Sequence, residues 1–336
     1  MTNDDLRSAG TPETDSSMGG RLGRAEALVA TPANVAGFDA TDPARHSVSE
    51  RKRPFGRWFR ETGWRHIVGV VMLVFSIFPI VFVLSASLNP RGTLTGTNAL
   101  FSVIGLDSYM RILSDPQIPY TAWYANSLLI ASITCVCTVF LGALAAYSFS
   151  RMRFTGRRFG LTSIVVVQMF PQMLAVVAIF LLLSTIGDYF PALGLDSRLG
   201  LIMVYLGGAL GVNTFLMYGF FNTVPASLDE AAKIDGAGHA RIFFTIILRL
   251  VAPILAVVAL LSFIGTFNEY IIASVVLIEP ENQTLAVGMI KLVSNPRYAD
   301  WSAFSAGAVM AAIPVLVLFL FLQKYIVGGL TAGAVK

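Results

Sequence analysis

Charged side chains are scarce in this sequence, and their scarcity excludes most soluble folds. Of its 336 residues, 13% are Asp, Glu, Lys or Arg and 55% are hydrophobic. A soluble domain has about 25% charged residues, so this chain has roughly half the usual share. The mean hydropathy is +0.69. Together these values indicate an integral membrane protein.

Residues that bind metals or carry out catalysis are also few. The two cysteines, Cys135 and Cys137, lie two apart in one apolar run, where a helix turns their side chains away from each other. The three histidines lie far apart along the chain. We therefore expect no disulfide and no metal site. The apolar runs show no cluster of His, Asp, Glu, Cys or Ser at catalytic spacing, which argues against a membrane-embedded enzyme.

Six apolar stretches make up most of the remaining sequence. Each is long enough to cross about 30 Å of hydrocarbon, which needs about 20 helical residues. They cover residues 67–88, 127–149, 162–185, 199–221, 251–278 and 303–327. All are apolar on every side, as lipid-embedded helices are. We predict an all-α polytopic membrane domain with six transmembrane helices over residues 61–336.

The N-terminal segment, residues 1–60, is polar and has no apolar pattern, so we predict a disordered tail.

The Lys and Arg residues of the loops predict how the chain is oriented in the membrane. Cytoplasmic loops of membrane proteins carry an excess of Lys and Arg. Segments on one side of the predicted membrane hold fifteen of these residues, and the loops on the other side hold five. This difference places both termini in the cytoplasm and explains the basic pI without nucleic-acid binding.

The loop between the fourth and fifth stretches contains the segment SLDEAAKIDGAG, which is too polar to span a bilayer. Ser227 and Glu230 have the spacing of a capping box, which satisfies backbone donors where a helix begins. We predict a short helix over 228–235. Gly236 and Gly238 would end this helix, because glycine adopts the left-handed cap conformation. A second helical run, ahead of Pro253, would lead into the fifth stretch, with the proline bending its entry.

So short a helix is not stable alone in water, and it must pack against another surface. Leu228, Ala231 and Ala232 lie at i, i+3 and i+4 and form a small apolar face. A helix that rests on lipid needs a larger and more strongly apolar face than this one. The pattern therefore favours docking to another protein, and the alternative is an interfacial helix on lipid or on its own bundle.

The same loop resembles the EAA signature of permease subunits of ABC importers, E-A-A-x-x-D-G-A followed by phenylalanine, leucine and proline. The matching positions are Glu230, Ala231, Ala232, Asp235, Gly236, Ala237, Phe243, Leu248 and Pro253. Arg249 stands where the family usually has proline. The segments AYSFSRMRFTG, QMFP, YLGG, TLAVGM and GLTAGAVK extend the resemblance to MalG-type maltose/maltodextrin permeases over about residues 60–336.

This resemblance implies an ABC importer type I permease of the MetI-like fold in a bacterial inner membrane. Such a subunit forms half of a carbohydrate pathway, here for maltose, maltodextrin or a related α-glucoside. The implied partners are a second, MalF-like permease subunit, a homodimeric cytoplasmic ATPase of the MalK type, and an extracytoplasmic sugar-binding protein. Because this chain has no G-x-x-x-x-G-K-[ST] loop, it would carry no cofactor, and ATP and Mg would bind to the ATPase.

The resemblance also implies roles for particular segments. Residues 227–237 would be the coupling helix, which transmits closure of the ATPase to the spans. The coupling residues would be Glu230, Ala231, Ala232, Asp235, Gly236 and Ala237. The loop of about residues 279–302 would probe the binding protein outside the cell, and the alternative is a plain connector. The C-terminal residues 328–336 would reach the ATPase, or form a frayed end.

Asn268 and Glu269 lie inside the fifth apolar stretch. An ionisable side chain at membrane depth is costly and faces the bundle interior or a watery path. A pathway role is one interpretation. The other is an interhelical hydrogen bond to a polar group such as Gln168, Gln172 or Asn213.

Two other transport functions remain as alternatives. An ion-coupled secondary transporter would show internal repeats, broken spans and buried ion-site carboxylates, and only Glu269 is clearly of that kind. Within the ABC class, the cargo could be another sugar, such as trehalose, or a glycerol phosphate, because a shared scaffold does not decide the substrate.

Overall fold

The computed structural model describes residues 59–90, 100–294 and 299–334. Nearly all of the predicted tail, 1–60, therefore lies outside the described residues. Every regular element within the described ranges is a helix, which confirms the all-α prediction. In chain order the elements are η3 (Phe59–Gly63), α3 (Trp64–Ser87), α4 (Asp107–Ser114), α5 (Tyr120–Arg151), α6 (Arg157–Gln168), α7 (Gln172–Tyr189), η5 (Pro191–Leu193), α8 (Arg198–Phe221), α9 (Ala226–Ile234), α10 (His239–Ile242), η6 (Phe243–Ile247), α11 (Leu248–Leu250), α12 (Ala252–Phe267), α13 (Ile271–Val276), η7 (Pro280–Asn282), α14 (Leu285–Ser294) and α15 (Trp301–Ala334).

The chain divides into two compact units, Met1–Val70 and Val71–Lys336. In the first unit the described residues form η3 and the first part of α3, and their apolar side chains are exposed. The second unit contains the rest of α3 and every later helix. The contacts described below all lie within this second unit.

Four continuous helical segments are long and apolar enough to cross a membrane: Phe59–Ser87, Tyr120–Arg151, Arg198–Phe221 and Trp301–Ile326. Two bent helix pairs bring the number of spans to six if each pair crosses once. The six predicted stretches therefore correspond to four continuous helices and two bent helix pairs. Many of their apolar side chains are exposed, as expected of surfaces that meet lipid or another subunit.

The third predicted stretch is not one straight helix. Helices α6 and α7 meet at 101°, with Pro171 in the connection between them. Proline has no backbone N–H to continue a helix, and it disfavours helical geometry in the residue before it. Hydropathy alone does not show this break, because most residues of the stretch 162–185 are apolar on both sides of Pro171.

The fifth predicted stretch is also interrupted, and Asn268 and Glu269 lie at the interruption. Helix α12 ends at Phe267, and α13 begins three residues after Asn268. At the other end of α12, the helical run His239–Leu250 bends by 78° into α12. This bend agrees with the predicted effect of Pro253. Arg249 lies exposed in α11, within the helical run that precedes the bend.

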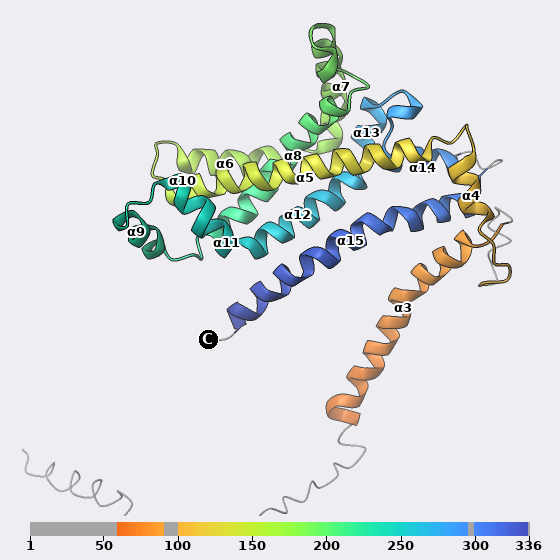
Figure 1. Ribbon diagram of the computed structural model, residues 1–336, viewed down its shortest axis with the longest axis horizontal. Coiled ribbons are helices and arrows are strands. Elements are labelled where there is room, and N and C mark those ends of the chain that lie inside the picture. Colours follow the sequence, from red (N-terminus) through yellow and green to blue (C-terminus); the bar gives the residue numbers. More distant parts are fainter. Residues whose placement is uncertain (1–58, 91–99, 295–298, 335–336) are drawn as a thin grey trace, which may run out of the picture. The chain divides into compact units, whose positions relative to one another are not determined.

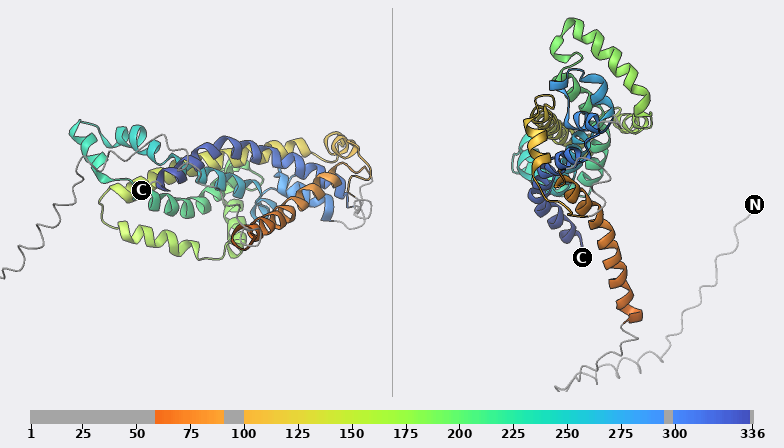
Figure 2. Two further views of the ribbon diagram at one scale, coloured as in Figure 1. Left: turned by 90° about the horizontal axis from the view of Figure 1, so that it is seen from below. Right: turned by 90° about the vertical axis from the view of Figure 1, so that its right-hand side faces the viewer.

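Helix α5 lies at the centre of the second unit. It packs against α8 and α12, and α12 in turn packs against α15 (Figure 1, Figure 2). The approach of α5 to α8 is close: a Cβ built on Gly142 would lie 2.9 Å from the Met217 side chain. Small residues allow such close helix packing in membranes. Buried apolar clusters follow α5 along its length, from Trp123 through Ile130 to Tyr147.

Candidate functional site

Helix α9 begins after Pro225, whose φ of −58° suits the entry to a helix. Among the described residues, no side chain caps this end. The predicted capping box is therefore wrong, because Ser227 and Glu230 both lie inside the helix. The sequence rule failed because the proline starts the helix two residues earlier than predicted.

The C-terminal end of α9 follows the prediction at Gly236. This residue has a φ of +80° and donates its N–H to the Lys233 carbonyl at 3.0 Å. The next residue, Ala237, donates to the Ala232 carbonyl at 2.9 Å, which completes a Schellman motif. Gly238 has an ordinary φ of −74° and precedes α10 instead, so its predicted role in ending α9 is wrong.

The two faces of α9 differ from the predicted apolar face. Ala232 points inward and is buried in the core beside Tyr147 and Phe243. The exposed side instead presents Leu228, Ala231 and Ile234, and the Ile234 side chain is 87% exposed. An isoleucine this exposed on a short, anchored helix is available to a partner.

An ion pair joins α9 to the end of α5. The Arg151 Nε lies 2.8 Å from the Asp229 Oδ2, and the two side chains are only 11% and 9% exposed. The same guanidinium donates through Nη2 to the Val224 carbonyl at 2.7 Å. Reasoning from the sequence missed this pair, because Arg151 was counted only as part of a basic loop.

Glu269 stabilises the break between α12 and α13. Its carboxylate accepts hydrogen bonds from the Tyr205 hydroxyl at 2.6 Å and from the backbone N–H of Ile272 at 2.8 Å and of Ala273 at 3.0 Å. A carboxylate at a helix N-terminus is stabilised by the backbone donors there. A hydrogen bond of the predicted interhelical kind is therefore present, and its partner in the structure is Tyr205 of α8. Asn268 is exposed and donates to its own helix, at the Ile264 carbonyl.

The beginning of the 279–302 loop is held against α5 by hydrogen bonds. The Trp123 indole N–H donates to the Pro280 carbonyl at 2.7 Å, and the Asn126 amide donates to the Glu281 and Gln283 carbonyls. The Ser127 hydroxyl accepts from the Leu285 N–H at 2.7 Å. The beginning of this loop is therefore fastened to one helix.

Helix α14, which follows in the same loop, packs closely on the same end of α5. A Cβ built on Gly288 would lie 2.1 Å from the Trp123 ring, so only glycine fits there without a shift. On the other side, the Asp196 carboxylate accepts from the Ile278 and Glu279 N–H groups and from the Asn282 amide. The described part of this loop is thus folded and anchored from two directions.

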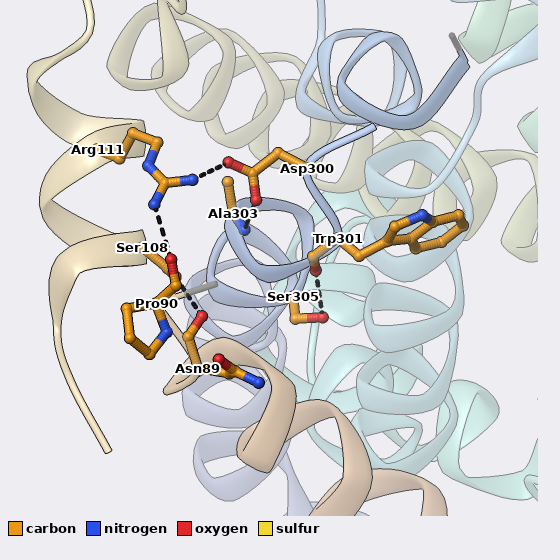
Figure 3. A network of polar contacts seen from close by, with 8 residues as sticks. All are labelled: Asn89, Pro90, Ser108, Arg111, Asp300, Trp301, Ala303 and Ser305. Carbon is orange, nitrogen blue, oxygen red and sulfur yellow. Dashed lines mark hydrogen bonds and ion pairs between the residues drawn. The ribbon is translucent and has the colours of Figure 1, made fainter. Parts of the chain in front are cut away.

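A second polar network joins α4 to the start of α15 (Figure 3). Arg111 forms an ion pair with Asp300 and donates to the Pro90 carbonyl at 3.1 Å. Asp300 also caps α15, because its Oδ1 accepts from the Ala303 N–H at 2.9 Å. Helix α15 runs to Ala334, so most of the predicted 328–336 tail continues this helix.

The part of the chain that the structure describes holds no group of three or more His, Cys, Asp or Glu residues placed to bind a metal ion. The candidate site consists of three connected structural features. A short helix exposes an apolar face, a buried ion pair connects it to a long helix, and a folded loop is fastened at the other end of that helix (Figure 1).

Residues 138–331 match the family model described as binding-protein-dependent transport system inner membrane component. The chain is 39% identical over 266 residues to the galactooligosaccharides transport system permease protein GanQ of Bacillus subtilis, covering 79% of this chain and 92% of GanQ. It is 45% identical over 231 residues to the maltodextrin transport system permease protein MdxG of the same organism, covering 69% of this chain and 80% of MdxG. The maltose/maltodextrin transport system permease protein MalG of Escherichia coli is 36% identical over 282 residues, covering 81% and 94%.

A solved structure shares the fold. It is the crystal structure of a bacterial ABC transporter involved in the import of the acidic polysaccharide alginate. The match has a TM-score of 0.68 and 27% sequence identity, and it covers 80% of this chain and 98% of the other chain.

Proposed function

The chain belongs to the family of binding-protein-dependent transport system inner membrane components, and we propose that it forms half of the membrane pathway of an ATP-driven oligosaccharide importer. It is a non-catalytic ABC permease subunit. Helix α9 is the observation that carries the proposal. It is a short helix between spans, fixed on its inner face, with Leu228, Ala231 and Ile234 exposed on the other. A helix of this kind suits a groove on a partner protein.

The partner of α9 in this proposal is a separate cytoplasmic ATPase, which binds ATP and Mg. Glu230 and Ala231 lie on the exposed side of α9 and supply direct contacts. Ala232 holds the helix to the core. The end of the helix is shaped by Asp235, Gly236 and Ala237. Closure of the ATPase would move α9 and bias the spans between two packed arrangements.

The excess of Lys and Arg supports a cytoplasmic position for α9 and for both termini. The 279–302 loop then faces outside, toward a sugar-binding protein. A second permease subunit would complete the pathway and cover apolar side chains that this chain exposes. The ion-coupled alternative loses its support, because the family works with binding proteins.

The interruption after α12 is a candidate part of the sugar pathway. Backbone that is not helical at membrane depth is tolerated where it lines a watery cavity or is buried in protein. Asn268 is exposed at this break, while Glu269 is occupied in holding it. We assign Asn268 to the pathway surface and Glu269 to its support.

Maltodextrin or a related α-glucoside is the proposed cargo. Relatives named for maltodextrin and maltose transport support this choice. A galactooligosaccharide is the second candidate, because a relative of similar identity is named for it. Trehalose and glycerol phosphate remain comparison substrates.

Uptake in cells that lack this chain tests the proposal. Cells complemented with the native chain should take up labelled maltodextrin in preference to galactooligosaccharide, trehalose and glycerol phosphate. Ile234→Asp should lower that uptake by about tenfold or more, because it places a charge in an apolar contact. Ile234→Leu should keep it. Normal uptake by Ile234→Asp, at equal membrane levels, would contradict the docking role of α9.

A further inference from the structure

Helix α5 connects α9 with the 279–302 loop by polar contacts at both of its ends. At its last residue, Arg151 pairs with Asp229 of α9. Near its first turn, Trp123, Asn126 and Ser127 hold the beginning of the loop by hydrogen bonds. The helix has 32 residues and contains no proline. At 1.5 Å per residue its length is about 48 Å, so one rigid element joins the two regions.

The route along the chain between the same two regions is broken several times. After α9 it passes through α10 and the π-helix η6, and then bends by 78° into α12. It is interrupted again between α12 and α13. π-Helices and kinks are places where a helix deforms. A displacement of α9 would be absorbed along this route, whereas α5 would carry it directly.

The contact between α9 and α5 is suited to transmit both pushing and pulling. One guanidinium binds both the Asp229 carboxylate in α9 and the Val224 carbonyl just ahead of α9. Val224 directly precedes Pro225, and α9 begins at the residue after this proline. Both charges are nearly buried, and removing either one leaves the other charge buried without a partner. The ion pair therefore ties the start of α9 to the end of α5.

We propose that the Arg151–Asp229 pair, here called the latch, transmits movement of α9 to α5 and through α5 to residues 279–285, the beginning of the 279–302 loop. Arg151 is a positioning residue in this account, because it acts through Asp229. The inference rests on the proposed function, since an ATPase must move α9. The competing account is that the pair only holds α9 in shape for docking.

The test uses the assembled complex in vesicles, with Cys135 and Cys137 replaced by alanine. A cysteine at exposed Glu281 reports on the loop through its labelling by a membrane-impermeant maleimide. In the otherwise native chain, the labelling rate should change when ATP is trapped in the complex. Asp229→Asn keeps the side-chain volume but removes the charge. It should reduce both that change and the sugar imported per ATP hydrolysed by about tenfold, with the ATPase still bound.

Two controls accompany this variant. Arg153→Gln removes an exposed positive charge two residues beyond the latch and should change neither measurement. The double variant Arg151→Lys with Asp229→Glu keeps opposite charges and should recover most of the coupling lost in Asp229→Asn.

Each of the following results would contradict the proposed role of the Arg151–Asp229 pair. If Asp229→Asn imports as much sugar per ATP hydrolysed as the native chain and shows the same labelling response to ATP, the pair does not transmit the movement, while docking of α9 on the ATPase still stands. Loss of ATPase binding in Asp229→Asn would assign the pair to docking alone. A native complex with no labelling response to ATP would exclude the α5 route. If the native chain bound no ATPase at all, the proposed function itself would fail.

Discussion

At the scale of single residues, Gly236 shows what a sequence can predict. Only glycine adopts a φ of +80° without strain, and the DGAG segment predicted that a glycine would end the helix. The ion pair of Arg151 was not predictable in this way. Its partner, Asp229, lies far along the chain, and pairing across that distance depends on how α5 and α9 pack.

Replacing Gly236 should impair transport without preventing insertion. Gly236→Pro cannot adopt the positive φ and removes the N–H that donates to the Lys233 carbonyl. We expect sugar uptake to be abolished. Gly236→Ala keeps the N–H and should have a smaller effect, with a strain of about 1 kcal/mol.

Gly238→Ala is the matched control for this position, because Gly238 has a negative φ and no heavy atom of the described residues lies within 4 Å of a built Cβ. It should transport normally. Uptake and membrane level are measured together for all three variants. Equal uptake by Gly236→Pro and Gly238→Ala would show that the shape of the end of α9 is unimportant.

At the scale of elements, hydropathy located the spans but not their breaks. The second and fourth stretches correspond to the continuous helices α5 and α8. A long apolar run without proline forms one continuous helix in a membrane, because the helix satisfies all of its backbone hydrogen bonds internally. The third and fifth are interrupted, at Pro171 and at Asn268. The fastening of the 279–302 loop to α5 was not predictable either, since it depends on side chains such as Trp123 that meet distant backbone carbonyls.

The start of α15 offers a prediction at this scale. Asp300 both caps the helix and pairs with Arg111, whose side chain is 40% exposed. An exposed ion pair contributes about 0–1 kcal/mol, and loss of an N-cap costs about 1 kcal/mol more. Asp300→Ala should therefore lower the free energy of unfolding more than Arg111→Gln does.

Thermal unfolding of the purified chain in detergent measures this difference. Asp300→Asn should fall between the two, because asparagine caps a helix but carries no charge. If Arg111→Gln is at least as destabilising as Asp300→Ala, the cap adds no measurable stability beyond the ion pair and the prediction is wrong.

At the scale of the whole molecule, the chain is a permease subunit whose described parts suit the transmission of movement. The composition indicated a membrane protein, and the EAA resemblance predicted that α9 contacts an ATPase. The arrangement in space adds the long helix α5, which joins α9 to the 279–302 loop (Figure 1). In the proposed function, substrate choice belongs to the same scale, because the pathway would be formed with a second subunit.

The central claim is that α9 docks on a cytoplasmic ATPase. Its most direct test is cross-linking from a cysteine at Ile234 in the assembled complex, with Cys135 and Cys137 replaced by alanine. The account predicts a cross-link to the ATPase subunit and no labelling of this cysteine by an impermeant reagent added outside intact cells. Labelling from outside, with no cross-link to the ATPase, would contradict it.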